Sequence, residues 1–454
     1  MGRCDRQTCL DRFRVNFVAY AAFVHFRLGS IGASLHAILR NHYARLTCVL
    51  AVALALRLAA GSWWQARLGP ERCFAFGDSE AYWTLAGQLA RGEPYQYGSP
   101  DAAVVRMPGY PLLLAGLFKL AGDEPPVSWA RALSAICGTL AVAAVYGLGR
   151  QLFGPPTGLV AACLASIYPG AIGDSVFVLS EAPFCPLMLA QLTASAAGWQ
   201  AATARRGAWL AALAGALAGL ATLMRPSWLL FAPFAVATGV VFGRQRAKHL
   251  RLGVIMLATL MLTMAPWWIR NAQVIGHFVP TTLQLGASLY DGLNPRADGS
   301  SEMSFVARFE ADERKAELEN AGRTEPFEYR LDRRMRDAAL DWAAAHPGRT
   351  AQLALVKVLR LWNVWPNDPE FRNWPLRLAV LATYAPAMAL AVCAAWRLRH
   401  RGWPCVLAWL PAVYLTLLHT VFVSSIRYRD PAVLSLMTLA AAALVQRISP
   451  SSDG

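Results

Sequence analysis

Long apolar blocks alternate with short polar stretches along most of the chain. An apolar stretch of about 17 to 25 residues can cross a bilayer as a helix whose backbone groups satisfy one another. We therefore predict an all-α polytopic membrane protein with external juxtamembrane helices. About ten membrane-spanning helices are expected, at residues 44–65, 127–149, 157–173, 181–200, 207–223, 227–243, 251–269, 376–396, 403–422 and 430–447.

One further apolar segment, PGYPLLLAGLFKLAG at residues 108–122, is shorter than a normal span. If it crossed the membrane, the side assigned to every later loop would be inverted. We predict a re-entrant or interfacial helix here.

The basic residues between the predicted spans indicate the topology. Cytoplasmic loops of membrane proteins carry an excess of lysine and arginine, and the loops here alternate accordingly. We predict a multi-pass protein of the cell (inner) membrane with both termini in the cytoplasm. The predicted inside residues are Arg150, Arg205, Arg206, Arg244, Arg246, Lys248, Arg251, Arg397, Arg399 and Arg401.

The chain is expected to form a single membrane domain with two large external loops. Residues 1–43 are predicted to be a cytoplasmic or interfacial segment, 44–447 the membrane domain and 448–454 a cytoplasmic tail, with no separate soluble module. Within the membrane domain, 66–126 and 271–375 are the external loops. The second is rich in charge and in helix formers, so it should be helical and lie over the outer membrane face.

Composition narrows the possible partners. Of the 454 residues 56% are hydrophobic, and the formal net charge is +15. The positive charges are spread over many loops and form no basic face, so we expect a lipid bilayer and no nucleic acid as a partner. The nine cysteines show no CxxC or Cys/His metal spacing, which argues against a disulfide framework and a metal site.

An acidic residue follows the first predicted span in GDSEAYWTLAGQLARGEPY, residues 77–95. Asp78 stands where a helix N-cap is expected, and Tyr82 lies one turn later on the same face. One interpretation is a simple capping aspartate. The other is a carboxylate at the membrane surface that acts as a general base toward an acceptor hydroxyl.

A second acidic residue, Glu181, lies in GDSVFVLSEAPF at the outer boundary of two predicted spans. An ionisable group is costly at that depth, so a functional role is the default interpretation. The alternative is that Ser180 and Glu181 cap the following helix. Asp174, in the same stretch, is interpreted as a boundary residue.

Several arginines stand at predicted outer helix ends: Arg106, Arg225, Arg270, Arg427 and Arg429. Guanidinium groups match phosphate oxygens in pairs, so they suit a phosphate-bearing lipid. Some of them could equally be interfacial anchors. The first two are preferred as phosphate ligands because each precedes a proline-interrupted helix start that fixes its direction.

At these residues the chain resembles the membrane-embedded GT-C superfamily of glycosyltransferases. The resemblance is to bacterial proteins related to protein O-mannosyltransferases and to the aminoarabinose transferase that modifies lipid A. The matching pieces, in family order, are DSEAYWTLA, RMPGYPLLLA, ARALSAICGTLAVAAVYGLGRQLFG, LSEAPF, GLATLMRP, PWWIRN and RYRDP.

The resemblance implies an inverting transferase that moves a hexose or pentose from a polyprenyl-phosphate carrier to a lipid, glycan or protein acceptor. The active site would be periplasmic or otherwise extracytoplasmic. Asp78 matches the acidic residue that acts in catalysis, and Glu181 a second acidic position near the active site. Arg106 and Arg225 fall where basic residues of relatives contact the donor phosphate.

Residue chemistry and resemblance together define a predicted site with no cofactor. Ser79, and not a second carboxylate, follows Asp78, which argues against a bound divalent metal. The metal dependence of the reaction is left open. The predicted catalytic residues are Asp78 and Glu181, and the predicted donor-binding residues are Tyr82, Arg106, Arg225, Arg270 and Arg427.

The main rival from a different class is a polytopic transporter or flippase of lipid-linked saccharides. Such a protein should show paired repeats and polar groups near the bilayer midplane. Here the candidate residues collect at one face, which favours surface chemistry. A polymerase or ligase of surface polysaccharide also fits the pattern, whereas a purely structural membrane protein fits it least well.

Overall fold

The computed structural model describes residues 41–68, 73–319, 324–366 and 374–448. The chain divides into two compact units, residues 1–51 and 52–454. The predicted N-terminal segment and C-terminal tail therefore fall almost wholly outside the described residues. The arrangement below concerns the second unit.

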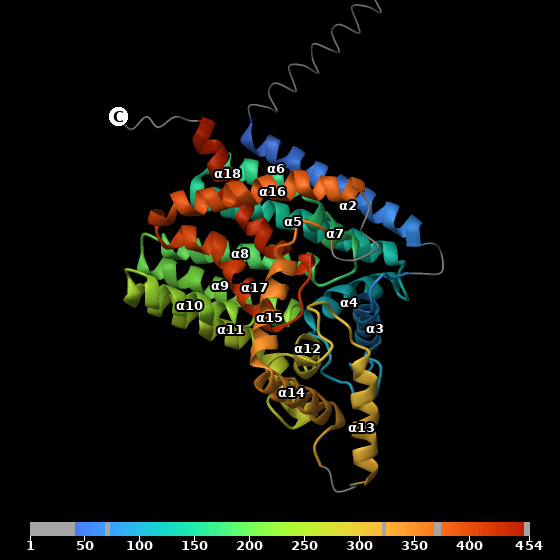
Figure 1. Cartoon of the computed structure of the whole chain (residues 1–454). Coiled ribbons are helices and arrows are strands. Elements are labelled where there is room, and N and C mark those ends of the chain that lie inside the picture. The colour runs from blue at the N-terminus through green and yellow to red at the C-terminus, as the bar shows by residue number, and fades with distance from the viewer. Residues whose placement is uncertain (1–40, 69–72, 320–323, 367–373, 449–454) are drawn as a thin grey trace, which may run out of the picture. The chain divides into compact units, whose positions relative to one another are not determined.

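The described residues are mostly helical and contain no β-strand (Figure 1). Helix α2 (His42–Leu68) begins in the first unit and ends in the second. It is followed by α3 (Gly77–Arg91), α4 (Gly109–Ala121), α5 (Val127–Phe153), α6 (Pro155–Ser166), α7 (Pro169–Val176), α8 (Glu181–Trp199), α9 (Ala204–Met224), η1 (Pro226–Trp228), α10 (Phe231–Phe242), α11 (Arg246–Ile275), α12 (Leu285–Gly292), α13 (Phe305–Glu319), α14 (Phe327–Ala345), α15 (Pro347–Leu361), α16 (Trp374–Arg397), η3 (Arg399–Arg401), α17 (Trp403–Val421), η4 (Ile426–Tyr428) and α18 (Asp430–Ile448).

Among the residues that the structure describes, six helices are long and apolar enough to cross a membrane: α2, α5, α9, α11, α16 and α17. This confirms the predicted class of multi-pass, all-α membrane protein. The segment predicted as one span at 157–173 is instead two helices, α6 and α7, that meet at a bend of 60°. Pro169 begins α7 and lacks the backbone N–H that a continuous helix needs.

If the bent pair counts as one span, the described residues hold seven helices of spanning length and hydropathy, where about ten were predicted. The remaining predicted spans also form helices, namely α8, η1 with α10, and α18. The short apolar segment at 108–122 becomes α4, a helix of 13 residues, which agrees with a segment too short to cross.

Small side chains allow the apolar helices to pack closely. Helix α8 packs against α5 and α9, and α9 packs against α11. Ala214, Ala218 and Ala221 on α9 are fully buried, while Leu213 and Leu220 on the same helix are exposed. Because lipid tails are as apolar as leucine, helices in a membrane gain stability by close packing of small residues, and larger apolar side chains can face lipid.

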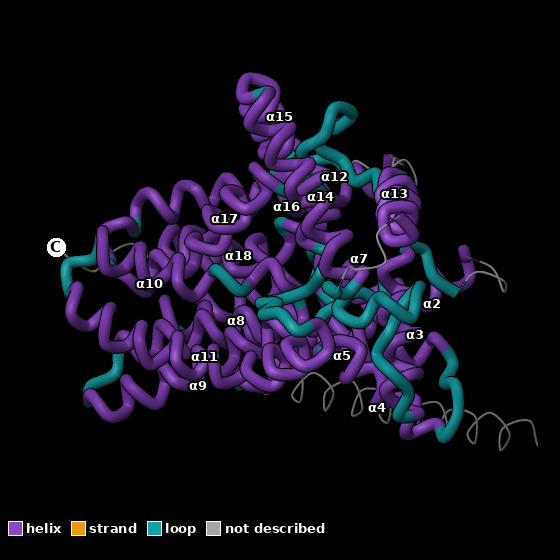
Figure 2. Tube along the Cα trace, turned by 90° about the horizontal axis from the view of Figure 1, so that it is seen from below, coloured by secondary structure: helices purple, strands orange, loops and turns teal. Residues whose placement is uncertain are grey.

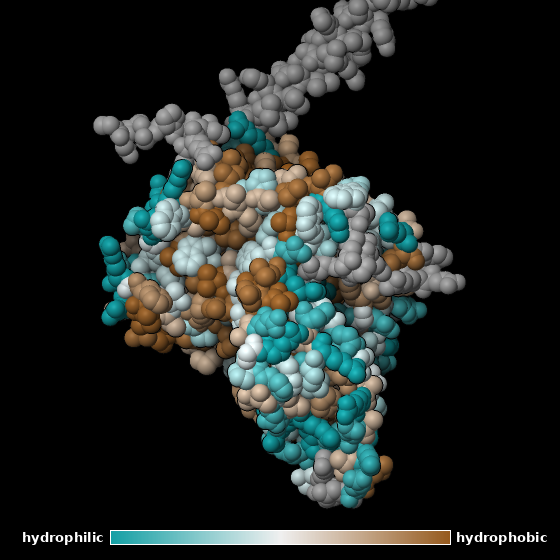
Figure 3. Space-filling model, in the orientation of Figure 1, coloured by the Kyte–Doolittle hydropathy of each residue, from teal (hydrophilic) through white to brown (hydrophobic). Residues whose placement is uncertain are grey.

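The charge-rich second loop forms helices α12 to α15, which lie together at one end of the second unit (Figures 1 and 2). Its helical nature is as predicted, whereas its place over the outer membrane face stays a prediction. Figure 3 shows hydrophilic side chains over α13 and α14, and more hydrophobic ones over the apolar helices.

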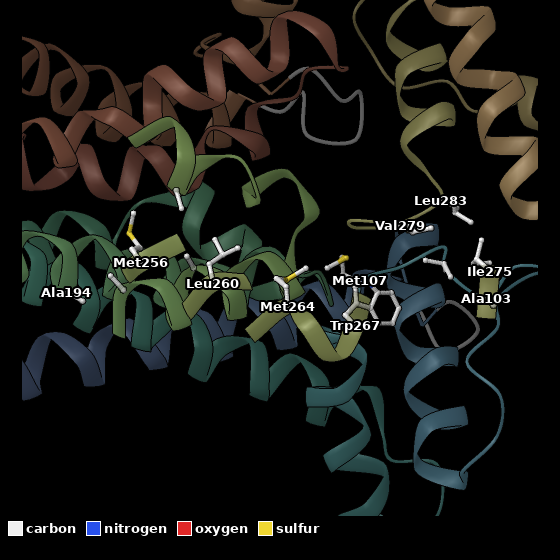
Figure 4. Close-up of a cluster of buried hydrophobic side chains, with 14 residues drawn as sticks. Ala103, Met107, Ala194, Met256, Leu260, Met264, Trp267, Ile275, Val279 and Leu283 are labelled. Atoms are coloured by element: carbon white, nitrogen blue, oxygen red, sulfur yellow. The ribbon is translucent and has the colours of Figure 1, made fainter. Parts of the chain in front are cut away.

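A buried apolar cluster joins the first external loop to α11 (Figure 4). Met264 and Trp267 of α11 lie in this cluster with Ala103 and Met107 from the loop. The two loop residues flank Arg106 in the sequence. Burial of its neighbours therefore fixes the backbone that carries this arginine.

Candidate active site

A large cavity of about 2660 Å³ opens between residues 76–107, residues 280–314, helix α14 and the ends of several apolar helices. Six of the seven predicted site residues line it, and they come from segments far apart in the sequence. These residues are Asp78, Tyr82, Arg106, Glu181, Arg225 and Arg427.

Asp78 is the second residue of α3, whose N-cap is Phe76. The interpretation of Asp78 as the capping residue is therefore wrong. Its Oδ1 lies 2.7 Å from Nη2 of Arg106, and its Oδ2 lies 3.3 Å from Nη2 of Arg427. The side chain keeps 38% exposure, so an acceptor in the cavity could reach it.

Opposing effects set the pKa of Asp78. Burial raises it, but the guanidinium groups of Arg106 and then of Arg427 outweigh burial, and the pKa lies below its ordinary value. The carboxylate is therefore ionised at neutral pH. It is a weak base for as long as the two guanidinium groups bind it.

Glu181 is the first residue of α8 and is only 2% exposed. Ser180 is the N-cap residue of α8, but its side chain makes no capping hydrogen bond. Oε1 of Glu181 lies 2.5 Å from Nη1 of Arg225 and 3.5 Å from Nε of Arg427. Arg427 thus bridges Glu181 and Asp78.

In these ion pairs three guanidinium groups share two carboxylates. Guanidinium N–H groups that the carboxylates do not use can bind an anionic ligand. In the part of the chain that the structure describes, no group of three or more His, Cys, Asp or Glu side chains could hold a metal ion. With both carboxylates bound by arginines, this cluster suits an anion better than a divalent cation.

A close backbone contact brings two of the arginines together. Arg106 precedes α4 and Arg225 follows α9. Gly109, in the first turn of α4, packs against the end of α9, where an added Cβ would lie only 2.6 Å from the carbonyl oxygen of Leu223. Since real Cβ atoms do not approach that closely, glycine is needed for the two helices to meet.

Neighbouring side chains orient Arg106 and Tyr82. Nη1 of Arg106 donates to Oε1 of Gln284, and its guanidinium carbon lies 6.0 Å from the centre of the Tyr82 ring. The Tyr82 hydroxyl donates to Oγ of Ser180 at 3.4 Å. Gln284 belongs to no motif, and we found no signal for it in the sequence.

Arg270, predicted to bind the donor, is not among the residues that line the cavity. Its Nη1 donates to the carbonyl oxygen of Ala103 at 2.8 Å, and its guanidinium lies over Trp267 at 5.1 Å. Glu328 of α14 binds the same loop, because it accepts from the backbone N–H groups of Ala103 and Val104 at 2.8 Å and 3.1 Å. Arg270 and Glu328 therefore clamp the loop that carries Arg106.

Burial raises the pKa of Glu328 to about 7, although the two N–H groups that it accepts from lower it. The carboxyl is 5% exposed. It is thus the group of the clamp that changes its charge near neutral pH.

The sequence analysis also missed Tyr428, although it stands inside the motif RYRDP. Its hydroxyl accepts from Nη2 of Arg427 at 3.2 Å, and its ring lies 5.6 Å from the guanidinium of Arg225. The His419 ring stacks on the Tyr428 ring, with the two ring centres 4.9 Å apart. Arg429, by contrast, is fully buried and donates to the carbonyl oxygen of Leu361 at 3.1 Å, which indicates a structural role.

Residues 105–269 match the sequence family described as dolichyl-phosphate-mannose-protein mannosyltransferase. Solved structures extend the likeness to most of the chain. The apo crystal structure of the Archaeoglobus fulgidus oligosaccharyltransferase gives a TM-score of 0.55 at 18% identity, over 90% of this chain and 51% of that one. The archaeal oligosaccharyltransferase AglB from Archaeoglobus fulgidus was solved in complex with an inhibitory peptide and a dolichol-phosphate. It gives a TM-score of 0.54 at 16% identity, over 91% of this chain and 52% of the AglB chain. The chain has the GT-C fold.

The GT-C chain thus spans about half the length of these solved structures. The match to a further structure, ArnT from Cupriavidus metallidurans bound to undecaprenyl phosphate, covers 88% of this chain and 77% of the ArnT chain at 17% identity. Its TM-score of 0.42 is too low to support a conclusion. No curated protein sequence matches the GT-C chain.

Proposed function

We propose that the protein is an inverting glycosyltransferase. It moves a sugar from a polyprenyl-phosphate-linked donor to a lipid, glycan or protein acceptor. The observation that carries this proposal is the cluster in which Arg106, Arg225 and Arg427 surround two carboxylates inside one cavity. The matched sequence family and the dolichol-phosphate bound to AglB support it.

The arginines supply what a departing lipid phosphate needs. When the glycosidic bond breaks, the phosphate gains negative charge, and preorganised donors aimed at it lower the barrier. Arg225 and Arg427 are 16% and 26% exposed, so each presents part of its guanidinium to the cavity. Guanidinium N–H pairs match phosphate oxygens better than an ammonium does.

Asp78 is the proposed base. The acceptor oxygen attacks the anomeric carbon, the bond from that carbon to the phosphate oxygen breaks, and the phosphate leaves with the electron pair. The acceptor proton passes to Asp78. A single displacement of this kind inverts the anomeric configuration.

The ion pairs of Asp78 couple donor binding to base strength. Donor phosphate oxygens compete for the N–H groups of Arg106 and Arg427 that otherwise lower the pKa of Asp78. Binding of the donor therefore raises this pKa. The carboxylate becomes a good base only when a donor is present.

The distribution of charged loop residues supports a periplasmic or extracytoplasmic cavity in the cell membrane. The two external loops that line the cavity hold many of the acidic residues, whereas the arginine-rich turns lie between other helices. On this topology both termini are cytoplasmic.

The test is sugar transfer from labelled polyprenyl-phosphate hexose or pentose in purified membranes. Native protein and Asp78→Asn are compared at matched expression, with Asp341→Asn as a matched control because Asp341 is an exposed residue of α14. We expect Asp78→Asn to lose at least about 100-fold in rate, since general base catalysis contributes that much.

Transfer that persists in Asp78→Asn would remove this residue from the mechanism. No transfer from any such donor, together with donor movement across the bilayer, would favour a transporter or flippase instead.

A further inference from the structure

Two carboxyl groups that the proposed reaction does not use line the same cavity. Asp174 lies on α7 and Asp430 is the first residue of α18. Both are buried, with 5% and 3% exposure. Buried carboxyl groups are rarely kept without partners, because the desolvation of each one costs free energy.

Asp174 lacks the partners that such a group needs. Its Oδ2 is buried and has no hydrogen-bond partner among the described residues. An unsatisfied buried acceptor of this kind destabilises the folded chain, and does so more strongly when it is charged. Because Asp174 lines the cavity, a ligand can supply the missing donor.

Asp430 approaches the same face of α7. Its Oδ1 accepts from the Tyr168 hydroxyl at 2.6 Å, while a Cβ added to Gly170 would lie 2.6 Å from its Oδ2. Gly170 and Asp174 are four residues apart and so share a face of the helix. The carboxyl groups of Asp174, Asp430 and Glu181 are close enough to interact electrostatically.

The cavity thus has two chemically different halves. The guanidinium half offers hydrogen-bond donors, and the half formed by Asp174 and Asp430, which we name the carboxyl half, offers acceptors. Arginines near the carboxyl half, among them Arg225 and Arg429, interact electrostatically with these acids. A neutral group with several hydroxyl donors therefore suits this half better than a cation.

We infer that the carboxyl half binds hydroxyl groups of the donor sugar, while the guanidinium half binds the phosphate. This inference rests on the proposed function and extends it from the phosphate to the sugar. Neighbouring sugar hydroxyls can donate to carboxylate oxygens in pairs, which satisfies Oδ2 of Asp174 and orients the ring.

The test compares two lipids that differ only in the sugar. Undecaprenyl phosphate and undecaprenyl-phosphate glucose or mannose are titrated against detergent-purified native protein, Asp174→Asn and the control Asp341→Asn. Asparagine keeps the shape but replaces one acceptor oxygen with a donor. We expect Asp174→Asn to weaken binding of the glycosylated lipid about 10- to 100-fold and to leave that of undecaprenyl phosphate unchanged.

The outcomes separate this inference from the proposed function. The inference alone would be overturned if the native protein bound the two lipids with equal affinity. It would also be overturned if Asp174→Asn weakened the binding of both lipids by the same factor. If the native protein bound neither lipid, the proposed function would fail as well. If Asp174→Asn does not fold, Asp430→Asn carries the same comparison, because its Oδ1 still accepts from Tyr168 and only Oδ2 is replaced.

Discussion

Two clusters of arginine and acidic residues in this protein have similar composition but different charge balance. The cavity cluster has three arginines and two carboxylates. The outer network, which joins α13 to α14 and reaches Asp101, has three arginines and four carboxylates. Arg330 lies 2.8 Å from Glu313 and 2.9 Å from Glu317, Arg334 lies 3.3 Å from Glu313 and 3.9 Å from Asp312, and Arg314 lies 3.1 Å from Glu317 and also pairs with Asp101. The cavity cluster consists of Asp78, Glu181, Arg106, Arg225 and Arg427, and the outer network of Asp101, Asp312, Glu313, Glu317, Arg314, Arg330 and Arg334.

The difference in balance separates ligand binding from structural support. In the outer network every charge has an opposite partner, and the pairs join one helix to its neighbour. In the cavity cluster the arginines outnumber the carboxylates that form ion pairs with them. Mutations in the two clusters should therefore affect different quantities.

The largest effect is expected from Arg427→Gln. Arg427 bridges both carboxylates, and removal of a preorganised donor from a developing anion costs about 100- to 1000-fold in rate. Transfer from labelled polyprenyl-phosphate sugar measures this loss. The midpoint of thermal unfolding should change much less, because Asp78 and Glu181 keep Arg106 and Arg225.

The matched control is Arg308→Gln, since Arg308 is an exposed residue of α13. An Arg427→Gln protein that transfers sugar at the native rate would show that this arginine has no role in the reaction.

Arg330→Gln in the outer network should show the opposite behaviour. It removes one partner of Glu313, which is 3% exposed and keeps its pair with Arg334. Because the charge keeps a partner, the loss of unfolding free energy should stay below the roughly 3 kcal/mol that a fully unpaired buried charge costs. Thermal unfolding in detergent should detect this, while transfer per folded molecule should fall far less than in Arg427→Gln.

Glu319→Gln is the control for Arg330→Gln, because its pair with Lys315 is exposed and such pairs contribute little. A loss of activity in Arg330→Gln as large as in Arg427→Gln, with unchanged stability, would remove the distinction between the clusters.

The smallest effect concerns the clamp on the Arg106 loop. The pKa of Glu328 in the folded protein is raised to about 7 from its ordinary value of 4.5. Its contribution to stability is therefore fully present below about pH 4.5 and is lost as the pH rises through about 7. The loss is at most about 3 kcal/mol.

Glu328→Gln removes this titration, so the difference in unfolding midpoint between native and variant protein should shift between about pH 5 and about pH 8. Native protein should lose stability relative to the variant at the higher pH. Parallel pH curves for the two proteins would show that Glu328 does not titrate in this range.

Most of the fold could be predicted from hydropathy, because a span is a local property of the sequence. The break between α6 and α7 could not, since the apolar run continues through Pro169 and hydropathy does not register a missing backbone donor. An apolar run indicates burial but not whether the helix is straight or long enough.

The ionic residues of the site could also be predicted from their positions beside apolar segments. Their partners could not, because these come from distant parts of the chain. Gln284 is 178 positions from Arg106, and Glu328 is 225 positions from Ala103. Arg270 was assigned by its position at a helix end, but the direction of its side chain depends on Ala103 and Trp267.

The contact between Gly109 and Leu223 also fixes the backbone on which two cavity arginines stand. Main-chain atoms of Leu223 set how closely the start of α4 can approach the end of α9. The backbones that carry Arg106 and Arg225 therefore keep their separation unless the two helices part, while the side chains can still turn to meet a ligand. Groups held in place before a ligand arrives lose less conformational entropy when it binds.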